Sequence, residues 1–312
     1  MDGLLNWIPY KFEKPDGTWQ LRWMDLAERH IAEPFFDETI AICLSKMRER
    51  SVYNPLSDTG FLAGSSRGIN AIPPTAFIFH VSRCGSTLLT QALSIDPANI
   101  VYAEAPLIDE ILRAFVQDKN LKEEEVEKWF KAAVKIMGQK RKSQYQQLFI
   151  KLDSWHIHFY PLLRKWFPET PFYFLSREPG AVIISHHKRR GLHSVPGIIE
   201  ASLLKIELEE RHYSDFNFFT AQVLEGYYKV LYDLVIANHP LDHFYDYSWG
   251  MDNLLKHFFA SITAKTTNES EMKKRLGFHS KYPGQPYHND IKVDLPDYHH
   301  ANLAYQNFIT AL

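Results

Sequence analysis

A strand, a short polar loop and a helix follow one another without a break in residues 77–93, FIFHVSRCGSTLLTQAL, and this order strongly constrains the fold. The apolar run from Phe77 to Val81 predicts a buried strand, and the leucines after Thr87 predict a helix. In such an arrangement, backbone N–H groups at the start of the helix are free to bind an anion. The segment therefore predicts an α/β protein with an anion-binding loop at residues 82–87.

The side chains of this loop suit an anion. Gly85 permits a backbone conformation that side chains resist, and Ser86 and Thr87 can cap the helix and donate hydroxyl groups. Arg83 adds a fixed positive charge with a forked set of donors, and Cys84 stands beside it. The alternative is a polar turn that only caps the helix, since short Gly/Ser loops before helices are common.

The loop departs from the G-x-x-x-x-G-K-[ST] pattern of nucleoside triphosphate-binding proteins. The first glycine is missing, because His80 and Val81 stand in its place, and Ser86 replaces the lysine that reaches the outer phosphates. An arginine two residues before the glycine, with Ser86 and Thr87 after it, resembles the 5′-phosphosulfate loop of sulfotransferases that use 3′-phosphoadenosine 5′-phosphosulfate. The resemblance implies that residues 83–87 bind this co-substrate and that Arg83 stabilises charge on the leaving group.

A second strand-to-helix segment, residues 171–191, strengthens the resemblance. An apolar strand is followed by Arg177, Pro179 suits the first helical turn, and Ser185 lies two turns further along. Sulfotransferases hold the 3′-phosphate of the co-substrate with an arginine and a serine in the pattern R-x-P-x-x-x-x-x-S, which this segment matches. Arg177 and Ser185 are therefore implied to bind the 3′-phosphate; the alternative is a surface arginine and a helix serine without a shared ligand.

Sulfuryl transfer needs a base that takes the proton of the acceptor. Glu104, after an apolar segment, stands in a place comparable to that of the glutamate base of many sulfotransferases, including the tyrosylprotein type. Asp153 stands where cytosolic sulfotransferases have the histidine of K-T-H, and Lys151 matches the lysine. His156 and His158 follow closely and could substitute. The alternatives are structural: a helix-start carboxylate, an N-cap, and surface or core histidines.

Composition excludes some classes of function. The formal net charge of −2 argues against a general nucleic-acid surface, which is normally basic. Against this balance, the run from His186 to Arg190 is a concentrated positive site that suits either a solvated helix end or a phosphate contact. The two cysteines imply no disulfide framework, and neither adjacent histidine pair has the spacing of a metal motif. We expect no metal, no secretory signal and no membrane span, and hence a cytoplasmic protein.

From Phe77 onwards, strands and helices alternate, as a parallel sheet flanked by helices requires. The expected fold is an α/β core of the P-loop-like, sulfotransferase type at residues 75–312, with an N-terminal extension at residues 1–74 packed on it. The core is expected to hold strands at 148–152, 171–176 and 243–247, helices at 106–116, 123–137, 159–166, 198–212, 215–237 and 253–262, and an exposed polar tail from residue 265.

The extension is expected to hold a hairpin around residues 15–17, a helix at 36–49 and a loop over 54–75. Its tryptophans, at positions 7, 19 and 23, either line an acceptor pocket or pack on the core. At the other end of the chain, Lys281 is the nearest candidate for the glycine- and lysine-rich loop of many family members, although the order of residues differs.

These features favour a sulfotransferase that moves a sulfuryl group from 3′-phosphoadenosine 5′-phosphosulfate to a hydroxyl or amine acceptor. Two alternatives stay open: a P-loop kinase, which the missing lysine and glycine disfavour, and a non-catalytic nucleotide-binding module on the same fold. The sequence determines neither the acceptor nor the oligomeric state.

Overall fold

The computed structural model describes residues 4–50, 53–278 and 298–312. The chain divides into two compact units, each assembled from separate segments. Unit 1 comprises Met1–Phe77, Thr87–Leu152 and Ala264–Leu276, and unit 2 comprises Ile78–Ser86, Asp153–Thr263 and Gly277–Leu312. The expected division into residues 1–74 and 75–312 stays a prediction, and each unit is described separately.

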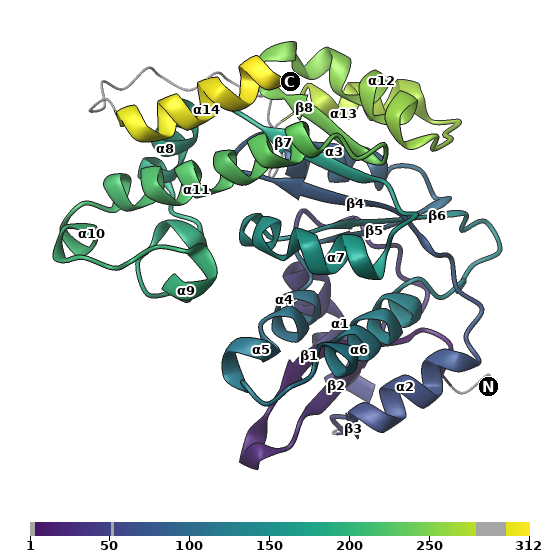
Figure 1. Cartoon of the computed structure of the whole chain (residues 1–312). Coiled ribbons are helices and arrows are strands. Elements are labelled where there is room, and N and C mark those ends of the chain that lie inside the picture. Colours follow the sequence, from purple (N-terminus) through teal and green to yellow (C-terminus); the bar gives the residue numbers. More distant parts are fainter. Residues whose placement is uncertain (1–3, 51–52, 279–297) are drawn as a thin grey trace. The chain divides into compact units, whose positions relative to one another are not determined.

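A parallel sheet of five strands runs through the described part of the chain, in the order β5-β6-β4-β7-β8. The strands are β4 (Pro74–His80), β5 (Asn99–Ala103), β6 (Gln147–Lys151), β7 (Phe172–Ser176) and β8 (Asp242–Asp246). Every residue of β5, β6 and β7 is buried, as expected for parallel strands with both faces covered. The predicted α/β class is confirmed, and Figure 1 shows helices on the connections between the strands.

Unit 1 begins with a small antiparallel sheet of β1 (Trp7–Glu13), β2 (Gln20–Asp25) and β3 (Leu56–Asp58). The predicted hairpin is confirmed, because β1 pairs with β2 around the short helix η2 (Pro15–Gly17). Phe12 stacks on Trp19 at a centroid distance of 4.6 Å, and both rings lie against Trp129 of α6 (Glu123–Met137). Trp19 therefore packs inside unit 1.

Most helices of unit 1 match the predicted ones, and two of them were not predicted. The helices of this unit are α1 (Phe36–Arg50), α2 (Thr59–Arg67), α3 (Ser86–Leu93, which starts one residue before the unit), α4 (Pro106–Leu112), α5 (Ala114–Gln117), α6 (Glu123–Met137) and α13 (Glu269–Leu276). The loop expected over 54–75 is wrong, because it contains β3 and α2. Asp58 caps α2 by accepting the N–H of Phe61 at 2.6 Å, and Leu62 and Ala63 are buried, which outweighs the glycines of this segment.

Unit 2 holds most of the remaining helices. They are η3 (Ser154–Phe159), α7 (Tyr160–Trp166), α8 (Pro179–Lys188), η4 (Leu192–Ser194), α9 (Ala201–Leu204), α10 (Glu210–Ser214), α11 (Phe216–Ala237), η5 (Tyr247–Trp249), α12 (Met251–Ile262) and α14 (His299–Ala311). The single helix expected over 198–212 is wrong: α9 ends where Lys205 takes a left-handed backbone with φ of 56°.

The polar tail expected from residue 265 is exposed at Glu269–Glu271, Lys273 and Lys274, as predicted, but it also contains two helices that were not predicted. In unit 1, α13 turns its charged residues outward and buries Met272 and Leu276, which lie one helical turn apart. In unit 2, α14 runs along α11, as Figure 1 shows. It buries Tyr305 and Phe308. Among the described residues, none of the helices has the length and apolar character that crossing a bilayer requires.

Candidate anion-binding and catalytic site

The loop that the sequence predicts as an anion site lies directly after β4, and α3 begins at Ser86. Three of its residues have a left-handed backbone: φ is 75° at Ser82, 52° at Arg83 and 87° at Gly85. Only glycine takes this region without a penalty, so the loop holds two strained non-glycine residues. A Cβ at Gly85 would lie 3.0 Å from the side chain of Met251. The predicted need for a glycine is confirmed by the angle, and the side chain of Met251 would have to shift to admit a Cβ.

Two buried histidines hold the start of the loop within unit 2. His80 Nδ1 accepts the backbone N–H of Ser82 at 3.0 Å, while His186 Nε2 lies 3.1 Å from Ser82 Oγ. His186 Nδ1 accepts the N–H of Gly191 at 3.1 Å, so a neutral His186 carries its proton on Nε2 and donates it to Ser82. The sequence analysis places His186 in a concentrated positive site that runs to Arg190. In the structure the His186 side chain is fully buried and contacts the loop, whereas His187 and Lys188 are exposed.

The two predicted anion motifs meet inside unit 2. Arg177 follows β7 directly, and its guanidinium donates a hydrogen bond of 2.9 Å to the backbone carbonyl of Arg83. The same guanidinium lies 4.3 Å from the ring centre of Tyr247, in a cation–π contact. The carbonyl of Arg177 accepts a hydrogen bond from the hydroxyl of Tyr228, a buried residue of α11. Arg177 is therefore fixed from three sides, next to the backbone of the loop.

The remaining residues of the two motifs are placed as follows. The guanidinium of Arg83 donates to the carbonyl of Arg189, just after α8. Ser185 lies on α8, half-buried and next to His186, which contacts the loop. Cys84 is 1% exposed, so its thiol is shielded from solvent. Both Ser185 and Cys84 therefore stand on elements that adjoin the loop, and their contact with a co-substrate stays a prediction.

In unit 1, Glu104 lies at the carboxyl end of β5 and Lys151 is the last residue of β6, the neighbouring strand. The N–H of Glu104 donates to the carbonyl of Lys151 at 2.9 Å, and their side chains form an ion pair of 2.8 Å. Lys151 Nζ also donates to Thr87 Oγ1 at 3.0 Å. Glu104, Lys151 and the last residue of the predicted anion loop thus form one connected polar group.

The two charged side chains of this group, Lys151 and Glu104, differ in their exposure to solvent. The side chain of Lys151 has no exposed surface, whereas that of Glu104 is 23% exposed. A buried ammonium requires a counter-ion, which Glu104 supplies. Glu104 has a left-handed φ of 53°, a conformation that costs about 1–2 kcal/mol for a side-chain-bearing residue. Burial, and then the charge of Glu104, raises the pKa of Asp37 above its ordinary value.

The other base candidates have structural partners in unit 2. Asp153 is the N-cap residue of η3, and its N–H donates to Nδ1 of His156 at 3.2 Å. His156 is completely buried, and its own N–H donates back to the carbonyl of Asp153 at 3.0 Å. For His158, burial lowers the pKa to about 4, with Lys205 adding to the effect. These contacts match the structural alternatives, and the choice of a base among the four candidates stays a prediction.

Several residues around the loop escape detection in the sequence. Asp246, at the carboxyl end of β8, is fully buried, accepts the hydroxyl of Ser176 at 2.6 Å and accepts the N–H of Ser248 at 2.9 Å. It thereby fixes η5, which carries Tyr247 to the guanidinium of Arg177. The sequence carries no clear signal for Asp246, because β8 (DHFYD) is itself polar. Lys281 lies outside the described residues, and its role stays a prediction.

No protein-family model and no curated protein sequence matches the chain. Among solved structures, the chain is similar to the sulfotransferase domain of the Synechococcus PCC 7002 olefin synthase over 77% of its own length and 95% of that chain, at 17% identity and a TM-score of 0.45. It is similar to a sulfotransferase from Alicyclobacillus acidocaldarius over 76% and 92%, at 12% identity and a TM-score of 0.38. A sulfotransferase of Mycobacterium tuberculosis H37Rv is similar over 80% and 81%, at 10% identity and a TM-score of 0.41. Because these identities and TM-scores are low, the similarities do not assign a function, and a function has to be inferred from the residues of this chain.

Proposed function

We propose that this protein is a sulfotransferase that moves a sulfuryl group from 3′-phosphoadenosine 5′-phosphosulfate to a hydroxyl or amine of a small acceptor. The observation that carries the proposal is the hydrogen bond of 2.9 Å between Arg177 and the carbonyl of Arg83, residues that are 94 positions apart. It joins the two segments whose motifs resemble the 5′- and 3′-phosphate sites of sulfotransferases. A polar turn that only capped a helix would have no need of a distant arginine.

The two phosphate groups have separate partners in this proposal. The 5′-phosphosulfate lies in the loop, where the N–H groups at the start of α3 and the hydroxyls of Ser86 and Thr87 donate to it. Arg83 adds positive charge, and it cannot serve as an acid because a guanidinium stays protonated. Arg177 and Ser185 bind the 3′-phosphate. Cys84 contributes its position in the loop and no chemistry.

The transfer step needs a base and a cation, which the polar group of unit 1 supplies. A lone pair of the acceptor attacks sulfur, the bond between sulfur and the bridging oxygen breaks, and adenosine 3′,5′-bisphosphate leaves. Glu104, which forms an ion pair with Lys151, takes the acceptor proton. Lys151, which already donates to Thr87, stabilises the negative charge on the departing phosphate oxygen. Asp153 is a second candidate for the base.

The first test measures nucleotide binding. Adenosine 3′,5′-bisphosphate should raise the melting temperature of the protein and ATP with magnesium should not. Arg177→Met should weaken the bisphosphate Kd about tenfold or more, because a charge-assisted phosphate contact is lost. Arg211→Met is the matched control and should leave the bisphosphate Kd unchanged. Arg211 is exposed and lies 3.7 Å from the ring centre of Phe218, so this substitution also removes an arginine–aromatic contact in unit 2. The opposite nucleotide preference would favour a P-loop kinase and refute the proposal.

The second test measures transfer of ³⁵S-sulfate from labelled co-substrate to 2-naphthol, cyclohexanol and 2-naphthylamine. Glu104→Gln should lower the turnover about 10²–10⁴-fold while bisphosphate binding is retained, the range typical of a lost general base. Glu124→Gln, which changes an exposed carboxylate of α6, should leave turnover unchanged. Bisphosphate binding without transfer to any acceptor or to water would instead favour a non-catalytic nucleotide-binding module. Unchanged turnover in Glu104→Gln would remove Glu104 from the mechanism.

Localisation in the cytoplasm and the absence of a nucleic-acid partner remain part of the proposal. The formal net charge of −2 agrees with the absence of a nucleic-acid partner. Fractionation of the source cells and an assay of binding to DNA and RNA test them directly.

A further inference from the structure

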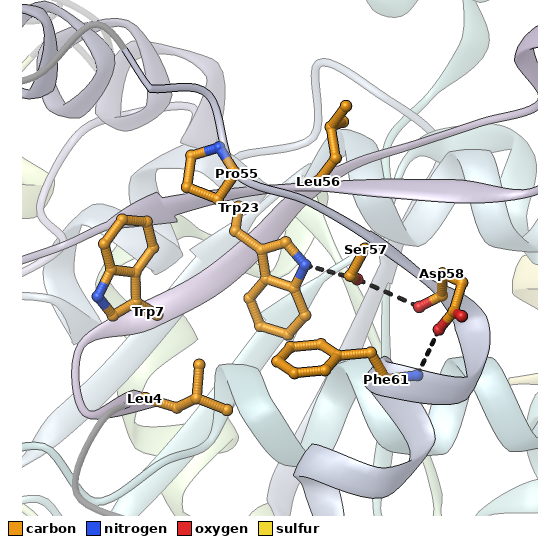
Figure 2. A pocket seen from close by; sticks show the side chains of 8 residues that line it. All are labelled: Leu4, Trp7, Trp23, Pro55, Leu56, Ser57, Asp58 and Phe61. Carbon is orange, nitrogen blue, oxygen red and sulfur yellow. Dashed lines mark hydrogen bonds between the residues drawn. The ribbon is translucent and has the colours of Figure 1, made fainter.

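A cavity of about 530 Å³ opens among the first residues of unit 1. This volume is in the range of sites that hold small organic molecules, which run from about 300 to 1,000 Å³. Figure 2 shows the rings of Trp7, Trp23 and Phe61 around it, with the side chain of Leu4 among them. The apolar lining consists of Leu4, Trp7, Trp23, Pro55, Leu56 and Phe61.

The wall at Trp7 is fixed by a buried amide. The N–H of Asn6 donates to Oε1 of Gln139 at 2.9 Å, and Nε2 of Gln139 donates to the carbonyl of Trp7 at 2.8 Å. Gln139 is 3% exposed, so these bonds are shielded from water. The backbone that carries Trp7 is therefore held on both sides of the residue, and little conformational entropy is lost when a ligand binds.

The facing wall is fixed in a similar way. The indole N–H of Trp23 donates to Ser57 Oγ at 2.8 Å, and the ring of Phe61 meets Trp23 edge-on at a centroid distance of 5.6 Å and an angle of 83°. Trp23 is 4% exposed, whereas Phe61 is 47% exposed, an unusual exposure for a phenylalanine in a helix. The polar atom of the indole is thus already satisfied, and the rings offer the cavity their apolar surfaces.

Among the described residues, the charge of the lining is negative. Of the eight described residues that line the cavity, only Asp58 is ionisable, and these eight include no lysine, arginine or histidine. Oδ1 of Asp58 accepts the N–H of Phe61 at 2.6 Å, and Ser57 Oγ donates to the carbonyl of Asp58 at 3.1 Å. Figure 2 shows this carboxylate at the end of the lining away from Trp7. A carboxylate beside aromatic rings attracts a cation through both Coulomb and cation–π terms, and it repels an anion.

We infer that this cavity binds a small aromatic molecule that carries an ammonium group, with its ring between the apolar walls and its charge toward Asp58. The inference does not rest on the proposed function, because all lining residues belong to the N-terminal segment of unit 1 and none belongs to the phosphate-binding motifs. A phosphate or sulfate group, the chemistry of the proposed co-substrate, is disfavoured here by the charge.

The test compares three naphthalene probes of similar size by isothermal titration calorimetry at pH 7 and constant ionic strength. 1-Naphthylmethylammonium should bind about threefold to fivefold more tightly than the neutral 1-naphthalenemethanol, the range expected for one exposed cation–π contact. 1-Naphthaleneacetate should bind more than tenfold more weakly than the ammonium. Raising the salt concentration should weaken the binding of the ammonium probe and leave the binding of the alcohol unchanged.

Two pairs of variants assign the binding to this cavity. Asp58→Asn, which keeps a good N-cap for α2, should abolish the preference for the ammonium over the alcohol, while Asp16→Asn, at an exposed residue of the nearby turn, should not. Phe61→Ala should weaken all three probes about tenfold, while Tyr213→Ala, which removes another exposed aromatic ring, should not. Circular dichroism and the melting temperature verify that each variant is folded.

Each other outcome overturns the inference. Absence of ammonium binding would show that the cavity is not a ligand site. Equal binding of the ammonium and the alcohol would reduce it to a general apolar site, and a preference that survives in Asp58→Asn would place the cation elsewhere on the protein.

Discussion

A half-buried glutamate gives the clearest prediction for the stability of unit 1. Glu110, on α4, is half-buried and accepts the backbone N–H of Phe12 on β1 at 2.5 Å. Burial raises the pKa of Glu110 from 4.5 to about 7, although the hydrogen bond from Phe12 opposes the shift. Below pH 4.5 the carboxyl is protonated in both the folded and the unfolded chain, so it places no ionisation penalty on folding.

The sign of the pH dependence follows from proton binding. Between pH 4.5 and about 7 the folded protein binds more protons at Glu110 than the unfolded chain does, so the free energy of unfolding falls as the pH rises. A change of pKa from 4.5 to about 7 corresponds to about 3 kcal/mol, at 1.36 kcal/mol for each pH unit. Above pH 7 the penalty is complete and no longer changes.

Glu110→Gln isolates this effect, because glutamine keeps an acceptor for the N–H of Phe12 and cannot ionise. Urea unfolding of the wild type and the variant should give equal stabilities near pH 4.5 and a variant more stable by about 3 kcal/mol at pH 8. Glu124→Gln, at an exposed carboxylate of α6, is the control and should differ from the wild type by the same small amount at every pH. A difference between Glu110→Gln and the wild type that does not change with pH would refute the reasoning.

Two further predictions concern unit 2 and the loop. Gly85→Ala should destabilise the protein by about 1–3 kcal/mol and weaken bisphosphate binding, because φ is 87° and a Cβ would lie 3.0 Å from Met251; differential scanning calorimetry and titration calorimetry measure both. Gly64→Ala, inside α2 with open space around a Cβ, should instead stabilise by about 0.5–1 kcal/mol, and equal effects at the two sites would contradict the argument. His158, with a pKa lowered to about 4, should contribute stability above pH 6.5 that is lost as the pH falls toward 4, since the unfolded chain then binds more protons. An NMR titration of its ring protons with a midpoint near 6.5 would show this prediction to be wrong.

Local sequence patterns predicted most of the elements correctly, and the errors have physical causes. The helix over Glu123–Met137 has a strong apolar stripe and a glycine at its end, which are local signals. Between residues 54 and 75 the glycines suggested a loop, but Asp58 caps a helix that buries Leu62 and Ala63. The two helices in the polar tail were missed because α13 and α14 have short apolar sides, and such helices are stabilised mainly by tertiary packing.

The candidate site was predicted in part for the same reason. The motif spacing around Arg83 and Arg177 is local, and so is the position of Glu104 after a strand. The partner of Glu104 could not be predicted from sequence position alone, because Lys151 reaches Glu104 only through the pairing of β5 with β6. The burial of His186 was missed since a run of cationic residues at a helix end usually faces solvent.

The sequence by itself determined that an apolar strand feeds a loop with Arg83 before Gly85, and that a second such turn carries Arg177. These are properties of consecutive residues, which strand and helix periodicity reveal. Only the tertiary structure decided that Arg177 bonds the carbonyl of Arg83, that Lys151 joins Glu104 to Thr87, and that an aromatic cavity forms in the N-terminal part. Such contacts depend on which strands become neighbours, and strand order is a long-range property that local patterns do not encode.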